Sequence, residues 1–290
     1  MRSNLTEVLS AVAPGAAGSF NVLDLDMALA VLDSAEALGL PVIVGIASRL
    51  FEAMRADIRT ASVLKAIEGA SVPAALHLDH AAPDQLPLIR TALDLGFSSL
   101  MIDGSKLPLQ QNAEVTAQVV EIARGYGASV EGELGGIAGE EGVADTGVDA
   151  PQPVPYTDAD EAEQFAHETG VDALAVAVGT AHGLYADEPK ISFDTIRTIA
   201  RRVGVPLVLH GASGVPDEAM RRCVDDGIRK INYFSGLLKT AMDRVRNDHA
   251  VTNNDWLGFK SRLTNDWQRE ITEQMQLYAR RRPGDTPAER

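Results

Sequence analysis

The chain has 290 residues, of which 45% are hydrophobic and 23% charged, and its formal net charge is -15. This composition is ordinary for a soluble globular protein. The acidic balance argues against non-specific binding to nucleic acid or to an anionic membrane, since either partner needs a basic face. Cys223 is the only cysteine, which excludes an intrachain disulfide and a cysteine-rich zinc site.

The N-terminal segment does not resemble a secretory signal, because Asn4, Thr6 and Glu7 interrupt its apolar residues. No uninterrupted apolar stretch of the sequence reaches the length of a membrane span. We therefore expect a cytoplasmic protein with no nucleic-acid partner and no membrane partner.

Short runs of apolar and β-branched residues alternate along the chain with longer segments of helical period. Two of the longer segments, 24–39 and 107–127, repeat apolar residues every three or four positions, as an amphipathic helix does. The short runs predict eight strands, at residues 18–22, 41–47, 73–79, 98–103, 128–134, 172–179, 205–211 and 228–234. Glycines that end the preceding helices stand just before several of these strands: Gly39, Gly96, Gly127, Gly204 and Gly227.

Eight strands in β/α alternation predict a (β/α)8 TIM barrel, an α/β fold. A doubly wound sheet is the rival, and no dinucleotide-binding fingerprint follows the first strand. We predict a single barrel domain over residues 1–290, with extra C-terminal helices over about 236–282 and a frayed tail at 283–290. Residues 135–157 form a long loop rich in glycine, proline and acidic residues, and loops of this length are usually functional or disordered.

Histidines stand where three predicted strands end, and TIM-barrel active sites lie at that edge of the barrel. His80, His182 and His210 follow the third, sixth and seventh strands. Three imidazoles from three strands match a catalytic zinc site that keeps a position open for a substrate oxygen. For His210 alone, a hydrogen-bonded histidine at the rim is an equal alternative, and the three histidines together favour a metal site.

Asp79 precedes His80 at the end of the third strand, where a turning backbone would let both side chains reach the cavity. Two roles stay open for Asp79: an acid/base group, which we favour, or a carboxylate that orients a histidine. His77 shares the face of Asp79 inside the strand, which indicates a structural or supporting role.

Two glycine- and serine-containing segments follow the seventh and eighth strands: "HGASG" at 210–214 and "NYFSG" at 232–236. Loops at these places are the recurrent phosphate site of TIM barrels, because their backbone N–H groups and hydroxyls hold the anion. Ordinary turn glycines would explain either segment alone. The two together, with Gly183 beside His182, favour a phosphate site.

Six motifs occur in an order typical of one enzyme family: "HLDHA" (77–81), "MIDGS" (101–105), "VEGELG" (130–135), "AVAVGTAHG" (175–183), "VLHGASG" (208–214) and "KIN" (230–232). Over about residues 4 to 245 the chain resembles the class II, zinc-dependent ketose-bisphosphate aldolases, most closely the tagatose-bisphosphate/fructose-bisphosphate branch. The resemblance implies a TIM-barrel lyase of carbohydrate metabolism and glycolysis. Its implied reaction is the reversible cleavage of a ketose 1,6-bisphosphate to dihydroxyacetone phosphate and glyceraldehyde 3-phosphate.

The resemblance also implies roles for individual residues and a homodimer or homotetramer. His80, His182 and His210 would bind Zn²⁺, and Asp79 would exchange the proton of the C4 oxygen. Glu141, or its neighbour Glu140, would be the catalytic glutamate of the loop after the fifth strand. Asp103 and Glu133 would form a second or alternative metal position. Substrate contacts are implied, with help from a monovalent cation (Na⁺ or K⁺), for Asn21, Gly183, Gly211, Ala212, Ser213, Asn232, Tyr233, Phe234 and Ser235.

The sequence departs from the family pattern in the half of the site that binds the aldehyde. Relatives read Asn-x-Asp-Thr or Asn-x-Ala-Thr where this chain has Asn232, Tyr233, Phe234 and Ser235, so a bulky ring replaces a small or acidic residue. Relatives also bind the distal phosphate with an arginine from the C-terminal helices, where the nearest candidates are Asn265, Arg262 and Arg269.

Three alternatives therefore remain beside a bisphosphate aldolase. The first is the same chemistry on another ketose 1-phosphate with a different aldehyde partner. A zinc hydrolase is less favoured, because the first strand lacks a His-x-His pair. A non-catalytic barrel that binds sugar phosphates is also less favoured, because every candidate ligand and Asp79 are present.

Overall fold

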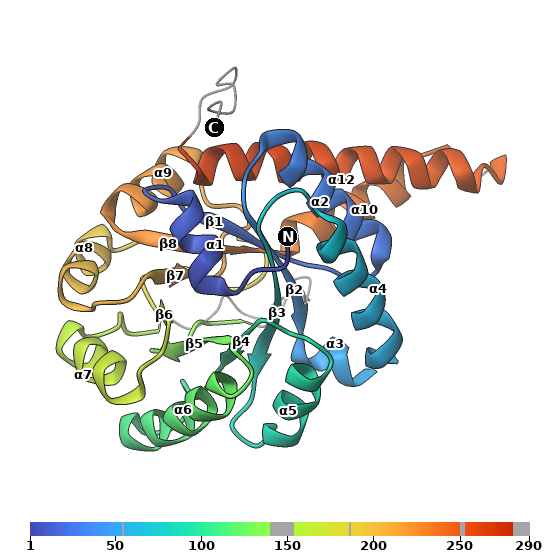
Figure 1. Ribbon diagram of the computed structural model, residues 1–290. Helices are drawn as coiled ribbons and strands as arrows, with labels where there is room; N and C mark the ends of the chain where they lie inside the picture. The colour runs from blue at the N-terminus through green and yellow to red at the C-terminus, as the bar shows by residue number, and fades with distance from the viewer. Residues whose placement is uncertain (54, 140–153, 186, 250–252, 281–290) are drawn as a thin grey trace.

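The computed structural model describes residues 1–53, 55–139, 154–185, 187–249 and 253–280. Eight parallel strands close into a barrel in the order β1 to β8, with helices around its outside (Figure 1). The strands are β1 (Ala17–Asn21), β2 (Val42–Ala47), β3 (Ala74–Ala81), β4 (Ser99–Ile102), β5 (Ser129–Leu134), β6 (Ala173–Val176), β7 (Leu207–Leu209) and β8 (Ile228–Tyr233). The predicted TIM barrel is confirmed, although β6 and β7 are shorter than expected.

Helices follow the strands around the barrel, and the segments predicted at 24–39 and 107–127 are helical. Asp24 caps α2 by accepting a hydrogen bond from the Met27 N–H, and Gly39 ends α2 in the left-handed conformation that glycine favours. The helices are α1 (Leu5–Val12), α2 (Leu25–Leu38), α3 (Ser48–Ala53), α4 (Ala56–Gly69), α5 (Leu86–Asp94), α6 (Leu109–Arg124), α7 (Ala159–Thr169), α8 (Phe193–Arg202), α9 (Asp217–Asp226), α10 (Ser235–Asn247) and α12 (Trp256–Tyr278).

The interior of the barrel has an apolar floor beneath a polar layer. Because side chains alternate along a strand, every second residue faces the interior. Near the amino ends of the strands these residues are apolar, and α1 packs against them with Leu5, Val8 and Leu9. Toward the carboxyl ends most of the interior-facing residues are polar and buried, among them Asn21, His77, Asp79, Glu131, Lys230 and Asn232. Since this layer is buried, its groups depend mainly on one another for hydrogen bonds and ion pairs.

The predicted C-terminal helices are present as α10 and α12. α12 lies across the outside of the barrel, packed on α2, α10 and α9, and projects beyond it (Figure 1). The Trp267 indole donates a hydrogen bond of 3.0 Å to the Leu237 carbonyl, which joins α12 to α10. The predicted frayed tail at 283–290 lies outside the described residues.

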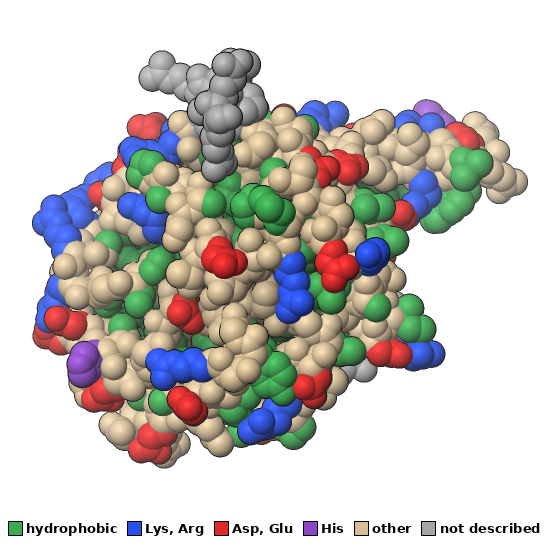
Figure 2. All heavy atoms as spheres, in the orientation of Figure 1, with side chains coloured by type: hydrophobic (Ala, Val, Ile, Leu, Met, Phe, Trp, Pro, Cys, Tyr) green, Lys and Arg blue, Asp and Glu red, His purple; other side chains and the backbone are tan. Residues whose placement is uncertain are grey.

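The face that carries α1 has a mixed surface, with acidic and basic side chains interspersed (Figure 2). None of the described helices combines the length and the apolar character needed to cross a bilayer.

Shortening a buried side chain of α1 is expected to destabilise the barrel. Leu5 is fully buried in the floor, so Leu5→Ala should lower the free energy of unfolding by about 2–5 kcal/mol through lost burial and the cavity left behind. Urea unfolding followed by circular dichroism measures the change. Ile58→Ala, at a half-exposed side chain of α4, is the matched control and should stay within about 0.5 kcal/mol of the parent. Equal stability of both variants would show that α1 is not part of the cooperative core.

Candidate functional site

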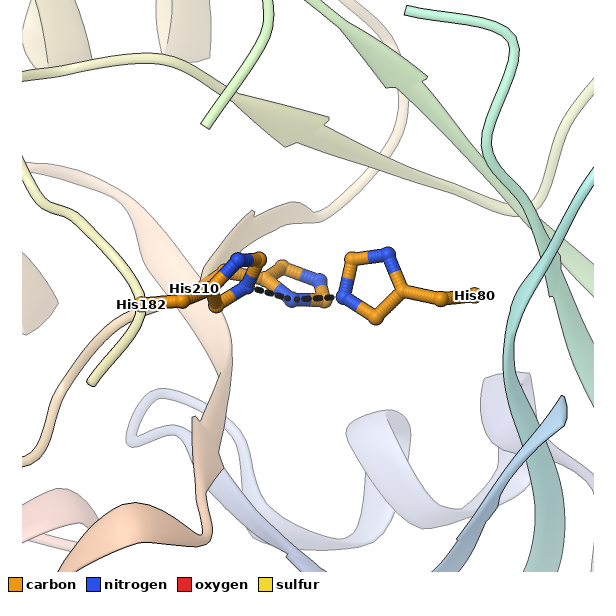
Figure 3. Close-up of side chains that lie close together, drawn as sticks. All are labelled: His80, His182 and His210. Atoms are coloured by element: carbon orange, nitrogen blue, oxygen red, sulfur yellow. Dashed lines mark hydrogen bonds between the residues drawn. The ribbon is translucent and has the colours of Figure 1, made fainter. Parts of the chain in front are cut away.

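The imidazoles of His80, His182 and His210 meet at the carboxyl end of the barrel. His80 reaches in from β3, and the other two rings come from the opposite side, after β6 and β7 (Figure 3). The Nδ1 atom of His210 lies 3.1 Å from Nε2 of His80 and 3.5 Å from Nε2 of His182. The structure therefore brings together three rings, of which the first and the last, His80 and His210, are 130 residues apart in the sequence.

The carboxylate partners of His80 and His210 indicate which nitrogens of these two rings carry lone pairs. Nε2 of His210 lies 2.9 Å from the Glu131 carboxylate, and Nδ1 of His80 lies 3.3 Å from that of Asp103. A carboxylate accepts a proton, so these nitrogens are the donors and the opposite nitrogens hold lone pairs. Burial lowers the pKa of His182 and of His210, which favours neutral rings.

Lone pairs that converge on one point repel one another unless a cation lies between them. The ligand atoms of His80, His182 and His210 lie within 4.8 Å of one another. Neutral imidazoles whose second nitrogen is held by a carboxylate are typical ligands of a divalent transition metal. The donor set therefore fits a metal ion.

A left-handed residue at the end of β3 brings two neighbouring side chains to the interior. His80 has φ of 52°, and the pairing of β3 with β4 is irregular between Leu78 and Ala81. In a regular strand Asp79 and His80 would face opposite sides. The Ser48 hydroxyl donates a 2.5 Å hydrogen bond to the His80 carbonyl and so holds this turn.

The Asp79 carboxylate is fully buried and is held by two amides. The Asn21 side chain donates to one oxygen at 2.7 Å, and the Asn232 side chain donates to the other at 3.1 Å. The same amide nitrogen of Asn232 lies 3.3 Å from Nδ1 of His210. Asp79 therefore sits beside the three rings. Nε2 of His77 lies 3.6 Å from Asp79, and Nδ1 lies 2.7 Å from the Ser99 hydroxyl.

A buried ion pair supports both Asp79 and His210. The Lys230 ammonium lies 2.7 Å from Glu131 and donates a second 2.7 Å hydrogen bond to the side-chain oxygen Oδ1 of Asn232, and both charged side chains are fully buried. Burial by itself raises the pKa of Glu131, but Lys230 and then His210 outweigh it and lower the pKa to about 2. The sequence assigned no role to Lys230, although a lysine inside a predicted barrel strand is a signal of a buried partner.

Asp103 and Glu133 form a second acidic cluster with His80, and their ligand atoms also lie within 4.8 Å of one another. Burial raises the pKa of Glu133 to about 8, and the charge of Asp103 adds to this effect. Burial also acts to raise the pKa of Asp103, but hydrogen bonds from His80 and Ser105 outweigh it and hold that pKa well below its ordinary value. This cluster has the ligand types of a second metal position.

The two predicted phosphate loops lie against each other. The Gly236 N–H, in the first turn of α10, donates a 3.0 Å hydrogen bond to the Ser213 hydroxyl. Gly211 has φ of 71°, and a Cβ atom there would lie 2.3 Å from the Ala181 carbonyl oxygen, so only glycine fits. Tyr185, which the sequence did not single out, donates a 2.7 Å hydrogen bond to the Gly211 carbonyl. Ala212, Ser213 and Ser235 are buried here.

Two of the expected substrate contacts have side chains that turn away from the three rings. The Tyr233 hydroxyl donates a 2.6 Å hydrogen bond to Glu270 of α12, and Phe234 is buried in the hydrophobic core. Tyr233 faces outward because it alternates with Asn232 along β8. The substrate contacts expected of Tyr233 and Phe234 would therefore be made by their backbone, and they stay a prediction.

The arginines proposed for a distal phosphate are engaged elsewhere. On α12, Arg262 pairs with Asp248 and Asp255, and Arg269 pairs with Asp266. The expected catalytic Glu141 and its neighbour Glu140 lie outside the described residues.

A cavity of about 300 Å³ opens beside His80 and His182. That volume is at the lower end of the range for small-molecule sites. Basic residues (Arg49 and Lys106) and acidic residues (Asp103 and Glu133) line it, together with Ser48 and Ser105.

Removal of the buried ammonium is expected to destabilise the fold more than removal of both charges. Lys230→Met leaves Glu131 buried without its partner and should cost about 3–5 kcal/mol of unfolding free energy. Lys230→Met combined with Glu131→Gln should recover part of that loss, because no uncompensated charge remains. Urea unfolding of the metal-free proteins measures both, and a double variant no more stable than Lys230→Met would contradict the interpretation.

Comparison with known proteins relates the chain to a single enzyme family. The family model for class II fructose-bisphosphate aldolase matches residues 4–282. A 6-phospho-5-dehydro-2-deoxy-D-gluconate aldolase from Shouchella clausii is 40% identical over 238 residues, which are 81% of this chain and 78% of that protein. The D-tagatose-1,6-bisphosphate aldolase subunit GatY of Klebsiella oxytoca is 44% identical over 175 residues, 60% of each chain.

A solved structure extends the similarity to the whole fold. The crystal structure of the YdjI aldolase from Escherichia coli K12 matches with a TM-score of 0.82 and 29% identity, and the match covers 96% of this chain and 97% of that one. The resemblance inferred from the six motifs is thereby confirmed. The chain belongs to the class II fructose-bisphosphate aldolase family, and it is an aldolase and hence a lyase.

Proposed function

We propose that this aldolase reversibly cleaves a ketose 1-phosphate into dihydroxyacetone phosphate and an aldehyde. The observation that carries the proposal is the convergence of three imidazole rings beside the buried Asp79 carboxylate. A fructose- or tagatose-type 1,6-bisphosphate, with glyceraldehyde 3-phosphate as the aldehyde, is the leading substrate. The family model and the GatY relative support that choice.

A second candidate substrate carries a carboxylate in place of the distal phosphate. The relative from Shouchella clausii is named for 6-phospho-5-dehydro-2-deoxy-D-gluconate, which has a ketone beside its phosphate and an acid at the other end. Cleavage of that compound between C3 and C4 would give dihydroxyacetone phosphate and 3-oxopropanoate. The chemistry at the dihydroxyacetone phosphate half is the same for both candidates.

His80, His182 and His210 would hold Zn²⁺ through the nitrogens that carry lone pairs, and imidazole ligands suit zinc. When bound, the ion would act as a Lewis acid that stabilises negative charge developing on substrate oxygens. Asp103 and Glu133, with His80, are the candidate second or alternative position.

Asp79 would move the proton of the C4 oxygen. In the cleavage direction its carboxylate would take that proton as the C3–C4 bond breaks, and in condensation it would return the proton. The amides of Asn21 and Asn232 fix one carboxylate oxygen each, so the group is oriented before substrate arrives. Glu141 remains the proposed base at C1, on the evidence of the family resemblance.

The phosphate of dihydroxyacetone phosphate would bind at the joined loops after β7 and β8. Backbone N–H groups near Gly183, Gly211 and Ala212, together with the hydroxyls of Ser213 and Ser235, supply donors there. A monovalent cation, Na⁺ or K⁺, would assist this binding.

We further propose a cytoplasmic homodimer or homotetramer that serves carbohydrate metabolism of the glycolytic type. Hydrophobic side chains gather at the end of the arm formed by α10 and α12 (Figure 2), where Trp256 is 66% and Leu257 is 83% exposed. Exposed apolar patches of this kind are typical of an interface.

Metal removal is expected to abolish cleavage. After chelation, release of dihydroxyacetone phosphate from fructose or tagatose 1,6-bisphosphate should fall at least about 100-fold, because the charge on the leaving fragment is no longer stabilised. Added Zn²⁺ should restore the rate. His182→Ala should lose bound metal and activity, whereas His167→Ala, at an exposed position of α7, should retain both. A metal-free protein with full activity would refute the proposal.

Neutralising Asp79 is expected to slow the proton transfer without emptying the metal site. Asp79→Asn should lower kcat by about 10²–10⁴-fold, with bound zinc unchanged by elemental analysis. The matched control is Asp84→Asn, at an exposed residue that follows β3, and it should keep the parent kcat. If Asp79→Asn also keeps the parent kcat, Asp79 is not the acid/base group.

A further inference from the structure

Resting on the proposed function, we propose that Arg49 and Lys106 form the subsite for a negatively charged group at the far end of the aldehyde half of the substrate. Both residues line the cavity of about 300 Å³ that His80 and His182 also line. They come from different parts of the barrel: Arg49 lies in the first turn of α3, after β2, and Lys106 lies in the loop between β4 and α6.

Arg49 is tied to the candidate metal centre by its neighbour. Ser48 begins α3, and its hydroxyl donates a 2.5 Å hydrogen bond to the carbonyl of His80. The start of α3 is therefore held against the residue whose ring joins the other two imidazoles. A guanidinium next to this anchor is suited to bidentate recognition of a carboxylate or phosphate.

Lys106 is tied to the same centre from the other side. The Ser105 hydroxyl and N–H donate hydrogen bonds of 2.6 and 3.1 Å to one oxygen of Asp103, and the other oxygen of Asp103 lies 3.3 Å from His80. Each cationic residue thus directly follows a serine that is hydrogen-bonded to His80 or to its partner. The start of α3 and the loop after β4 are therefore both held near His80, and both line the cavity.

The substrate class follows from the charges that must be accommodated. The family model and two relatives name three kinds of substrate: fructose bisphosphate, tagatose 1,6-bisphosphate and 6-phospho-5-dehydro-2-deoxy-D-gluconate. Each of these compounds carries an anionic group at both ends. The loops after β7 and β8 account for one of the two. In a chain of net charge -15, the second anion needs local cations.

Two other assignments compete with this one. Arg262 and Arg269 could take the anion, but they lie on the C-terminal arm and are not among the residues that line this cavity. Alternatively, Arg49 and Lys106 could merely balance Asp103 and Glu133, which line the same cavity. The second alternative predicts no discrimination between charged and neutral aldehydes.

The test compares matched aldehydes in the condensation direction with dihydroxyacetone phosphate. Four zinc-loaded proteins are each assayed with two pairs of aldehydes. They are the parent, Arg49→Gln, Lys106→Gln and the double variant. Glyceraldehyde 3-phosphate is paired with glyceraldehyde, and 3-oxopropanoate is paired with propanal. Circular dichroism and bound zinc verify that the variants are intact. Lys65→Gln, at an exposed position of α4, is the matched control for loss of one positive charge.

We expect the parent to prefer at least one anionic aldehyde over its neutral partner. Each single variant should lower kcat/KM for that anion by about tenfold, while the neutral aldehydes stay within about twofold. Arg49→Lys and Lys106→Arg should retain most of the preference, because they keep the charge. The pair with the larger loss identifies the natural anion as phosphate or carboxylate.

Other outcomes overturn the assignment, and they separate it from the proposed function. Equal losses with charged and neutral aldehydes would mean that the two cations only balance Asp103 and Glu133. If Arg262→Gln lost the preference for the anionic aldehyde while Arg49→Gln and Lys106→Gln kept it, the subsite would lie on the C-terminal arm. In both cases the aldolase activity itself would stand. Failure of the parent to condense any of the four aldehydes would overturn the proposed function together with the subsite.

Discussion

The buried ion pair between Lys230 and Glu131 is the interaction on which the arrangement of the site depends. Through Glu131 the ammonium of Lys230 fixes the orientation of the His210 ring, and through Asn232 it fixes one oxygen of Asp79. These side chains are buried, so each of them depends on its neighbours for hydrogen bonds. One charge therefore aligns a candidate metal ligand and a candidate proton-transfer group together.

This polar layer is stable because the barrel beneath it is closed and apolar. α1 and the small and branched side chains of the strand starts form a floor, and the strands carry the polar residues above it at every second position. β3 departs from that alternation at His80, where the left-handed backbone turns a second side chain inward. A conformation of this kind costs about 1–2 kcal/mol for a non-glycine residue, which the surrounding contacts must offset.

Single serine side chains hold the segments around this centre in place. Ser48 joins α3 to His80, Ser105 joins its loop to Asp103, and Ser213 joins the loop after β7 to the start of α10. In TIM barrels the chemistry stays with the strand ends while the loops vary the substrate. Relatives named for different sugar phosphates fit that division, because the buried layer serves the part of the reaction they have in common.

The sequence by itself determined the barrel, the family and the residues at the strand ends. Strand and helix periods are local properties, and equivalent ends of parallel strands lie on one edge, so His80, His182, His210 and Asp79 could be expected together. Only the tertiary structure decided which way each side chain points and what it pairs with. Tyr233 turns outward, and Lys230 finds a partner nearly one hundred residues away on β5. Such pairings depend on strand register and loop packing, which bring together residues that no local pattern relates.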